Sequence, residues 1–547
     1  MIGRVAGVVA MAVLAAACST GGTEPEKTFG ATVPTSTTSV PTTVSASSTL
    51  PTAPSTTRPT ATTTTTSTST TTTSTTQPLV PLDPTGATIR EMQQAMDEGS
   101  LTAVALTAFY LERIAAYDDS GPALNALITV NPAALDIAAT LDAERAETGP
   151  RSPLHGIPIV VKDNFNTADM PTTAGSVALA EFTPTDDAAQ VALLREAGAI
   201  ILAKANLYEF ARTTQTLSSV DGLTLHPWNP TRNVGGSSGG TAAAVTVEFA
   251  AAGLGTDTCG SIRMPSAFAG LYGLRPTVGL TSNDGIVPLA PWSDTAGPMT
   301  RSVDDLAILL DISTGGGTEY QSAAAGSGLD GVRIGVLESF ISAADGQVAG
   351  AIRNVLAIAE GAGATLVPVE IPGRSNLVGD GPSVVLRAFA FALGDYLAQY
   401  PDAPVSSLAE IVDSGRYLSA NRDRLLTHLS WGSLDTLEYR AAQDRREPLR
   451  AAVEAVMAAN DLDAIAYPAV AAVPAPVGSH QPGNNCTTAA VAGLPALVLP
   501  AGLAADMPTG LELLGAPYSE PTLIAIAAAY ERVAGPRPLP PGVGLEP

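Results

Sequence analysis

Two glycine- and serine-rich segments in the middle of the chain carry the residue types needed for nucleophilic chemistry. The first is Gly235-Gly-Ser-Ser-Gly-Gly240, and the second runs from Gly255 to Pro265 as Gly-Thr-Asp-Thr-Cys-Gly-Ser-Ile-Arg-Met-Pro. A serine hydroxyl attacks a carbonyl carbon only when a base takes its proton. Backbone amides in such loops can stabilise the oxyanion that then forms. The two segments therefore favour a serine nucleophile, provided that the chain supplies a base.

Lysine is the residue type best suited to be that base. The chain has three lysines against 25 arginines, and only Lys162 and Lys204 lie in the part with ordinary composition. Arginine does not lose its proton in proteins, whereas a buried lysine can be neutral near pH 7. Lys162 follows a short apolar run and is our candidate base. We assign Lys204 a structural role, because it follows a predicted strand and no glycine-serine motif accompanies it.

Other catalytic patterns fit the sequence less well. The segment 235–240 contains Gly-x-Ser-x-Gly, but the residues before it, His226–Asn233, include two prolines instead of the strand that a nucleophile elbow requires. An α/β-hydrolase that uses His428 or His480 is therefore disfavoured. No lysine has a serine three residues before it, which excludes the penicillin-binding type of enzyme. Cys259 is a rival nucleophile, but no motif places a base beside it.

The overall composition excludes several classes of partner. The 547 residues carry a formal net charge of −24, which repels phosphate backbones, so we expect no nucleic-acid partner. The four histidines and three cysteines show no zinc-type spacing, so we expect no metal site. We also expect no cofactor, because protein groups and water suffice for serine chemistry.

The N-terminal region is typical of an exported protein. Residues 1–17 contain one arginine followed by a short apolar run, and Leu14-Ala-Ala-Ala17-Cys18 resembles a bacterial lipobox. We predict a lipoprotein signal peptide at 1–17, lipidation of Cys18, and anchoring to the outer face of the bacterial membrane. The alternative is an ordinary signal peptide with an incidental cysteine. Because 38 of the 50 residues from 31 to 80 are Thr, Ser or Pro, residues 18–82 are predicted to be a disordered tether.

Residues 83–547 have ordinary composition and are predicted to form one catalytic domain of the α/β class. Hydrophobic periodicity predicts a single large mixed β-sheet covered by helices. We expect helices within 89–117 (two), 188–197, 351–361, 383–399, 434–446, 449–459 and 522–533. We expect strands within 154–161, 199–202, 332–337, 365–371, 464–467, 496–499 and 512–514.

Several motifs together resemble the amidase signature family, and they occur in that family's order. They are Leu154-His-Gly-Ile-Pro-Ile-Val-Val-Lys-Asp-Asn164, Thr172–Ser176, Gly235–Gly240, Thr256–Pro265, Gly273–Gly279, Asp294–Pro298 and Gly493–Gly502. The resemblance extends over nearly all of the globular part. The segments Asp284–Pro288 and Asp294–Met299 are most similar to the bacterial peptide-amidase subgroup.

The resemblance implies a Ser-cisSer-Lys triad. Ser261 would be the nucleophile, Ser237 the bridging serine held by a cis peptide bond, and Lys162 the base. The backbone amides of Thr258, Cys259, Gly260 and Ser261 would form the oxyanion hole. This chain departs from the family at Cys259, where glycine is usual, so we expect the backbone to avoid a positive φ there. Whether Cys259 pairs with Cys486 is left open by the sequence.

Three further residues are expected to support the loops of the site. Asp257 and Arg263 flank the nucleophile loop and are predicted to fix it as an ion pair or hydrogen-bonded clamp, with a solvated pair as the alternative. Ser238 is predicted to support the loop by hydrogen bonding. Structural roles are assigned to Asp163, Asn164 and His155.

The resemblance implies hydrolysis of a carboxamide through a seryl acyl-enzyme, with release of ammonia or an amine from a small-molecule or peptide amide. One alternative is an amidotransferase subunit that amidates mischarged tRNA, which the N-terminal region and the acidic charge disfavour. Another is a catalytically silent binding lipoprotein, which would have lost a triad residue. The segment 376–446, with Phe389, Phe391, Tyr396 and Tyr417, is a candidate for substrate specificity, although these aromatics suit a helix core equally well. The sequence does not determine the substrate or the oligomeric state.

Overall fold

The computed structural model of the protein describes residues 82–326 and 328–545. The predicted signal peptide at 1–17, the lipidation site Cys18 and the tether at 18–82, except for its last residue, lie outside the described residues. All of the described residues belong to one folded unit.

A mixed β-sheet of 11 strands forms the centre of the fold. Its strand order is β1-β3-β2-β6-β8-β7-β12-β13-β11-β9-β10, and β4 and β5 form a separate hairpin. The neighbours β3, β2 and β6 run parallel, as do β11, β9 and β10, whereas the other pairs are antiparallel. The strands are β1 Leu127–Val130, β2 Pro158–Lys162, β3 Ile200–Ala205, β4 Leu217–Ser218, β5 Gly222–Leu223, β6 Ala252–Asp257, β7 Tyr272–Arg275, β8 Thr295–Thr300, β9 Arg333–Val336, β10 Thr365–Pro368, β11 Ala464–Pro468, β12 Ala496–Ala504 and β13 Met507–Leu514.

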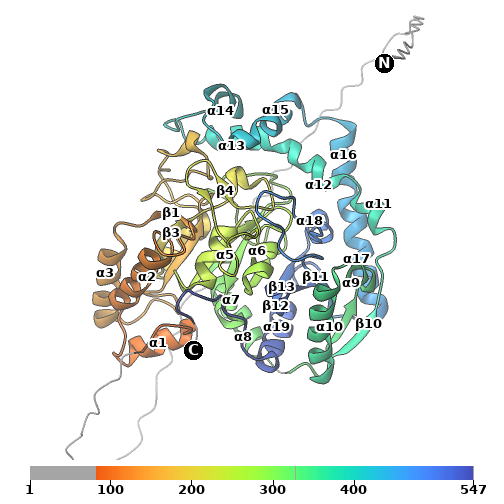
Figure 1. Ribbon diagram of the computed structural model, residues 1–547, viewed down its shortest axis with the longest axis horizontal. Helices are drawn as coiled ribbons and strands as arrows, with labels where there is room; N and C mark the ends of the chain where they lie inside the picture. The colour runs from red at the N-terminus through yellow and green to blue at the C-terminus, as the bar shows by residue number, and fades with distance from the viewer. Residues whose placement is uncertain (1–81, 327, 546–547) are drawn as a thin grey trace, which may run out of the picture. The chain divides into compact units, whose positions relative to one another are not determined.

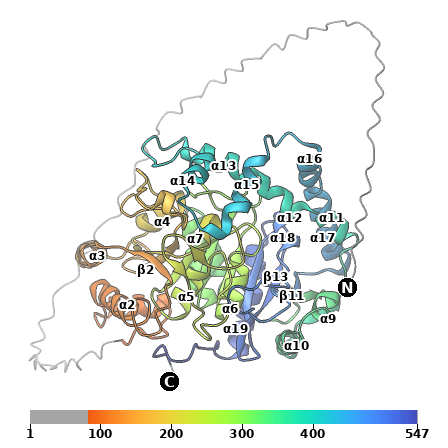
Figure 2. The ribbon, with the colours of Figure 1, turned by 45° about the horizontal axis from the view of Figure 1, so that its top comes forward.

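Helices cover this sheet, and α12 to α16 lie together along one side of the unit, at the top of Figures 1 and 2. The α-helices are α1 Ile89–Asp97, α2 Ala103–Tyr117, α3 Ala134–Thr148, α4 Ala189–Glu196, α5 Gly239–Thr246, α6 Arg263–Ala269, α7 Val303–Ser313, α8 Glu319–Ala324, α9 Glu338–Ser342, α10 Gly346–Gly361, α11 Arg374–Val378, α12 Gly381–Val384, α13 Phe389–Leu397, α14 Leu408–Ser414, α15 Arg422–Ser430, α16 Leu437–Asp444, α17 Arg446–Asn460, α18 Thr487–Ala492 and α19 Glu520–Ala534. The 3₁₀ turns are η1 Val177–Leu179, η2 Glu209–Ala211, η3 Val385–Ala388 and η4 Ser419–Asn421.

Two large apolar cores hold the helices against the sheet. One joins β2, β3 and β6 to α1, α2 and α5, and the other joins β9, β12 and β13 to α7, α10 and α19. Local signals agree with this packing: Thr88 caps α1, because its hydroxyl accepts from the Glu91 amide while the Glu91 carboxylate accepts from the Thr88 amide. The mixed sheet covered by helices confirms the predicted fold class.

Two helical predictions need correction. The helix expected at 383–399 is divided into the end of α12, the 3₁₀ turn η3 and α13. Val384 and Val385 stand at this division, and β-branched residues are poor helix formers. The break expected at Pro448 falls instead before Arg446, because proline is tolerated in the first turn of a helix.

By length and composition, one helical stretch among the described residues, Arg374–Leu397, is apolar enough to cross a membrane. The stretch is interrupted at Gly379, where φ is 49°, and again at η3. In α13, Phe389 and Leu393 are fully buried in an apolar cluster with Leu207 and Phe210. The buried residues of α13 therefore belong to the packed core of the folded unit.

Candidate active site

Two neighbouring parallel strands bring the predicted base and the nucleophile loop to the same edge of the sheet. Strand β2 ends at Lys162, and β6 ends at Asp257, directly before the loop that contains Ser261. The two strands pair in parallel with Val161 opposite Leu254. Because the carboxyl ends of parallel strands lie at the same edge, this pairing places Lys162 beside the start of the nucleophile loop.

The glycine-serine segment 235–240 packs tightly between this edge and a neighbouring loop. A side chain at Gly236 would place its Cβ 1.9 Å from the carbonyl oxygen of Gln215, so only glycine fits there. The Gly236–Ser237 peptide bond is cis. The backbone amide of Ser238 donates to the carbonyl oxygen of Ser261 at 3.2 Å, which connects the two segments directly. The hydroxyl of Ser238 donates to the carbonyl oxygen of Thr256 at 3.2 Å.

Lys162 is fully buried, and in the part of the chain that the structure describes its side-chain partners are hydroxyl groups, not carboxylates. Its Nζ lies 2.9 Å from Oγ of Ser237 and 2.8 Å from Oγ1 of Thr256. Burial lowers the pKa of Lys162 to about 7, although the charges of Asp257 and Asp294 act in the opposite direction. Near neutral pH a large fraction of Lys162 is therefore uncharged and able to accept a proton.

The nucleophile loop presents Ser261 to a pocket and leaves several backbone amides unbonded. The Gly260 amide donates to Oδ1 of Asp257 at 2.8 Å, and Gly260 carries the positive φ of the loop, 88°. Cys259 has no positive φ, as we expected. Within the described part of the chain, the amides of Thr258, Cys259 and Ser261 donate no hydrogen bond. Three of the four amides predicted for the oxyanion hole are therefore free for a ligand, and the fourth is occupied by Asp257.

Asp257 is the centre of a buried charge cluster that fixes this loop. Its carboxylate lies 3.1 Å from Nε of Arg263 and 2.9 Å from Nη1 of Arg275. Burial alone raises the pKa of Asp257, but the two guanidinium groups outweigh it and hold this pKa well below its usual range. Arg263 also binds Glu512 of β13 at 2.5 Å, so the cluster connects the loop to the other half of the sheet.

A disulfide bond joins Cys259 of the loop to Cys486 at the start of α18, with the two Cα atoms 5.2 Å apart. The side-chain amide of Asn484 donates to the Cys259 carbonyl oxygen at 3.4 Å. With its sulfur in this bond, Cys259 has no free thiol. The hypothesis that Cys259 is the nucleophile therefore loses its basis.

The residues that were assigned structural roles occupy buried, bonded positions. Lys204 forms a fully buried ion pair with Asp163, with Nζ and Oδ1 3.0 Å apart. His155 is held at 2.9 Å from the Leu141 carbonyl oxygen. Asn164 lies closer to the site than a purely structural role requires, because its side-chain amide donates to Oγ1 of Thr256, the hydroxyl that also binds Lys162.

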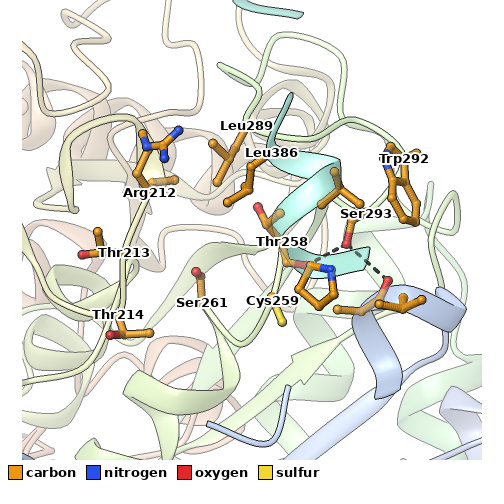
Figure 3. A pocket seen from close by; sticks show the side chains of 15 residues that line it. Arg212, Thr213, Thr214, Thr258, Cys259, Ser261, Leu289, Trp292, Ser293 and Leu386 are labelled. Atoms are coloured by element: carbon orange, nitrogen blue, oxygen red, sulfur yellow. Dashed lines mark hydrogen bonds between the residues drawn. The ribbon is translucent and has the colours of Figure 1, made fainter. Parts of the chain in front are cut away.

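Two adjoining pockets open at the site, and Ser261 lines the first (Figure 3). The first has an empty volume of about 550 Å³ and the second about 930 Å³. Both are lined in part by Ala211, Thr258 and Leu289. The segment 376–446 contributes Leu386 to the first pocket and Tyr396 to the second, whereas Phe389 belongs to the core.

Sequence reasoning missed four residues that shape the site: Thr256, Arg275, Glu512 and Arg212. Thr256 and Arg275 lie inside the motifs Thr256–Pro265 and Gly273–Gly279, but neither residue was predicted to have a role. Glu512 had a signal in the sequence, because a charged residue between leucines in a predicted strand must be paired when the strand is buried. Arg212 had none, since no motif surrounds it.

Comparison with known proteins gives a consistent result. The family profile described as Amidase matches residues 105–524. A glutamyl-tRNA(Gln) amidotransferase subunit of Chloroflexus aurantiacus is 36% identical over 479 residues, covering 82% of this chain and 96% of the relative. The peptide amidase of Stenotrophomonas maltophilia superimposes with a TM-score of 0.77 at 37% identity, covering 84% of this chain and 99% of that chain. A peptide amidase bound to the competitive inhibitor chymostatin gives a TM-score of 0.78 at 36% identity, with the same coverage.

These relatives correct the predicted location. Several curated relatives are subunits of a glutamyl-tRNA(Gln) amidotransferase, and charged tRNA is a substrate found inside cells. The prediction of an exported protein, lipid-anchored at Cys18 to the outer face of the membrane, is therefore wrong. It depended on a short apolar run and one cysteine, a weak pattern beside a match of 479 residues.

Proposed function

Because this chain belongs to the amidase family, whose members act on amide carbon–nitrogen bonds, we propose that it hydrolyses carboxamides through an acyl-enzyme on Ser261. The observation that supports this most is the contact between Lys162 and Ser237 at 2.9 Å, together with the lowered pKa of Lys162. A buried lysine that is partly neutral at pH 7 is suited to be a general base.

In the first half of the proposed reaction, Oγ of Ser261 attacks the carbonyl carbon of the amide. Its proton passes to Oγ of Ser237, while the proton of Ser237 passes to neutral Lys162. The resulting ammonium then returns a proton by the same route to the leaving nitrogen, so that ammonia or an amine departs. Water attacks the acyl-enzyme with the same base, which releases the acid and restores Ser261.

The tetrahedral intermediate of each half carries a negative oxygen that needs backbone donors. We assign this role to the free amides of Thr258, Cys259 and Ser261. Each well-placed donor of this type contributes about 3 kcal/mol to the transition state. The Asp257 cluster keeps the loop in shape, since its carboxylate accepts from the Gly260 and Ile262 amides at 2.8 and 3.1 Å.

The proposed substrates are small carboxamides and C-terminally amidated peptides. The peptide amidases that superimpose on this chain are 36–37% identical to it, which supports this class. The pocket beside Ser261 is lined mostly by apolar residues such as Leu289, Leu386 and Val491, and its size suits one small acyl or amino-acid unit.

The test is ammonia release from a panel of primary amides and amidated peptides, with Ser261→Ala as the matched control. We expect the wild type to release ammonia and the variant to lose at least about 10⁴-fold in rate, because removal of a nucleophilic serine eliminates the acyl-enzyme route. Equal release by both proteins would reject Ser261 as the nucleophile. No release from any amide would reject the proposed function.

A second candidate function is that of an amidotransferase component, and its support is the 36% identity to the glutamyl-tRNA(Gln) amidotransferase subunit of Chloroflexus aurantiacus. Such a component would use the same Ser261 chemistry and pass the ammonia to another protein of the complex. The net charge of −24 disfavours direct contact with tRNA. The two functions differ in whether charged tRNA alters ammonia release.

A further inference from the structure

Arg212 is a cation in the wall of the Ser261 pocket. It follows the 3₁₀ turn η2 and lines the pocket together with Thr213 and Thr214. Figure 3 shows these three residues along one wall beside Ser261, with Leu289 and Leu386 near the arginine. No other charged residue lines this pocket among the residues that the structure describes.

Neutral partners hold the Arg212 guanidinium in place. Its Nη1 contacts Nε2 of His428, and its centre lies 5.6 Å from the ring of Phe389. Burial, with a smaller contribution from the charge of Arg212, lowers the pKa of His428 to about 3, so this imidazole is neutral and accepts the hydrogen bond. Among the residues that the structure describes, the Nε of Arg212 has no hydrogen-bond partner, and the guanidinium uses one of its five donors, in the contact with His428.

The positive charge of Arg212 is not compensated within the described part of the chain. Burial and the neighbouring cation Arg424 lower the pKa of Arg212 to about 10 against a smaller opposing effect of Tyr208, and no carboxylate of the described residues acts on it. Three fully buried cations of this protein behave differently from the partly buried Arg212: Lys204, Arg263 and Arg275 each have an ion-pair partner at 3.1 Å or less. A buried charge without a counter-ion is costly, and an anionic ligand would remove that cost.

The charged residues that line the two pockets are of opposite sign. The adjoining pocket is lined by Asp284, Asp294 and Asp395 and carries no basic residue among its lining groups. A negatively charged group is therefore attracted to the first pocket and repelled from the second. The guanidinium, with its planar arrangement of donors, matches a carboxylate better than other small polar groups.

We propose that Arg212 is a specificity-determining residue that binds a carboxylate carried by the substrate, so that the preferred substrates are amides with a second, ionised carboxyl group. This inference rests on the proposed amide hydrolysis. It adds the charge class of the substrate, and its failure is distinguishable from failure of the hydrolysis itself.

The test compares amides that differ only in charge. In one arm the carboxylate is on the acyl side, with succinamate and glutaramate set against the neutral 4-oxopentanamide and the cationic 4-aminobutanamide. In the other arm it is on the leaving group, with N-butanoylglycine set against N-propylbutanamide. The measured quantity is the ratio of kcat/KM for the carboxylate substrate to that for its neutral partner, with the full-length protein.

We expect a ratio of roughly 10 to 100 in at least one arm, the range of a charge-assisted hydrogen bond to a buried partner. In Arg212→Gln the ratio should fall to about 1, and in Arg212→Lys it should recover in part because the charge is restored. Arg353→Gln, which removes an exposed arginine on α10 that lines neither pocket, is the matched control and should keep the wild-type ratio.

Each outcome decides the proposal. Wild-type hydrolysis without preference for the carboxylate substrates in either arm overturns the role of Arg212 but leaves the proposed function standing. A preference that persists in Arg212→Gln also overturns it, because another group must then bind the carboxylate. Absence of hydrolysis of every amide by the wild type rejects the proposed function itself. As a check that does not depend on turnover, competitive inhibition by succinate should exceed that by butanoate in the wild type and not in Arg212→Gln.

Discussion

At the scale of single residues, Lys162 combines two properties that rarely occur together in a lysine. It is fully buried, and its nearest partners are the hydroxyls of Ser237 and Thr256 at 2.9 and 2.8 Å. Lys204 is equally buried but is paired with Asp163. Burial lowers the pKa of both lysines, and at Lys204 the charge and hydrogen bond of Asp163 oppose that effect directly, whereas Lys162 has no ion pair among the described residues.

The pKa of Lys162 predicts the pH dependence of the reaction. Only the neutral amine accepts a proton, and burial lowers the pKa of this amine to about 7. We therefore expect kcat/KM to fall about tenfold per pH unit below 7 and to level off above 8. A rate profile from pH 5 to 9 with an uncharged amide substrate measures this. A profile that is flat, or that decreases between pH 6 and 8, contradicts the role of Lys162 as the base.

Replacing Lys162 by arginine tests the same role without removing the charge. Arginine stays protonated, so we expect Lys162→Arg to lose about 10²- to 10⁴-fold in kcat while the protein remains folded. Turnover is compared at equal folded concentration, as judged by circular dichroism and thermal unfolding. Near-normal turnover in this variant would show that Lys162 supplies charge and not a base.

Some residues of the candidate site have a signal in the sequence, and others do not. Scarcity of lysine indicated Lys162 as a base, and the resemblance of the two glycine-serine segments to the amidase signature family assigned Ser237 and Ser261, because both signals are local in the chain. Two features were not predictable: the contact of Asp257 with the Gly260 amide, and the position of Arg212 as a charged residue in the wall of the Ser261 pocket. Both depend on how the fold arranges groups in space, which no local pattern contains.

At the scale of elements, the nucleophile loop depends on the short turn between β6 and α6. Asp257 ends the strand and Arg263 begins the helix, and the ion pair between them closes the loop. Arg275, from β7, completes the pairing. These three charges are buried, so we expect the removal of any one of them to loosen the loop.

Replacing Asp257 by asparagine should therefore be costly. The variant leaves Arg263 and Arg275 buried with less counter-charge, and breaking a buried pair in this way costs about 3–5 kcal/mol of unfolding free energy. Denaturant unfolding measures the loss. Glu338→Gln, which breaks an exposed pair with Arg353, is the control and should have a much smaller effect. Equal effects of the two substitutions would contradict a central role for the Asp257 cluster.

The elements also show where periodicity succeeds and fails. The strands at 199–202 and 464–467 and the closing helix at 522–533 were predicted close to their observed bounds, because each has a strong apolar pattern. The region 383–399 was predicted as one helix, but it is divided at η3, where the β-branched residues Val384 and Val385 stand.

At the scale of the whole folded unit, the sheet order explains why residues far apart in the chain share one site. Strands β2 and β6 are neighbours although about 90 residues separate them, and β13 contributes Glu512 to the same charge cluster. The alternation of strands and helices predicted a mixed sheet, but not this order, because strand order depends on long-range pairing.

The function of the whole molecule is tested by its response to tRNA. If the protein is a self-sufficient amidase, glutamyl-tRNA and ATP should leave its ammonia release unchanged, because the net charge of −24 disfavours tRNA binding. Release is measured with and without both compounds at low and physiological salt. A several-fold stimulation that requires charged tRNA would favour the amidotransferase alternative.

The most direct test of the central claim is to label the activated serine. A fluorophosphonate reacts when a serine Oγ displaces fluoride from phosphorus, and peptide mass spectrometry then locates the phosphonyl group. We expect one label, on the peptide that contains Ser261, absent in Ser261→Ala and strongly slowed in Lys162→Arg. A label on another residue, or amide turnover by a protein whose Ser261 is fully labelled, would contradict the assignment of Ser261 as the nucleophile.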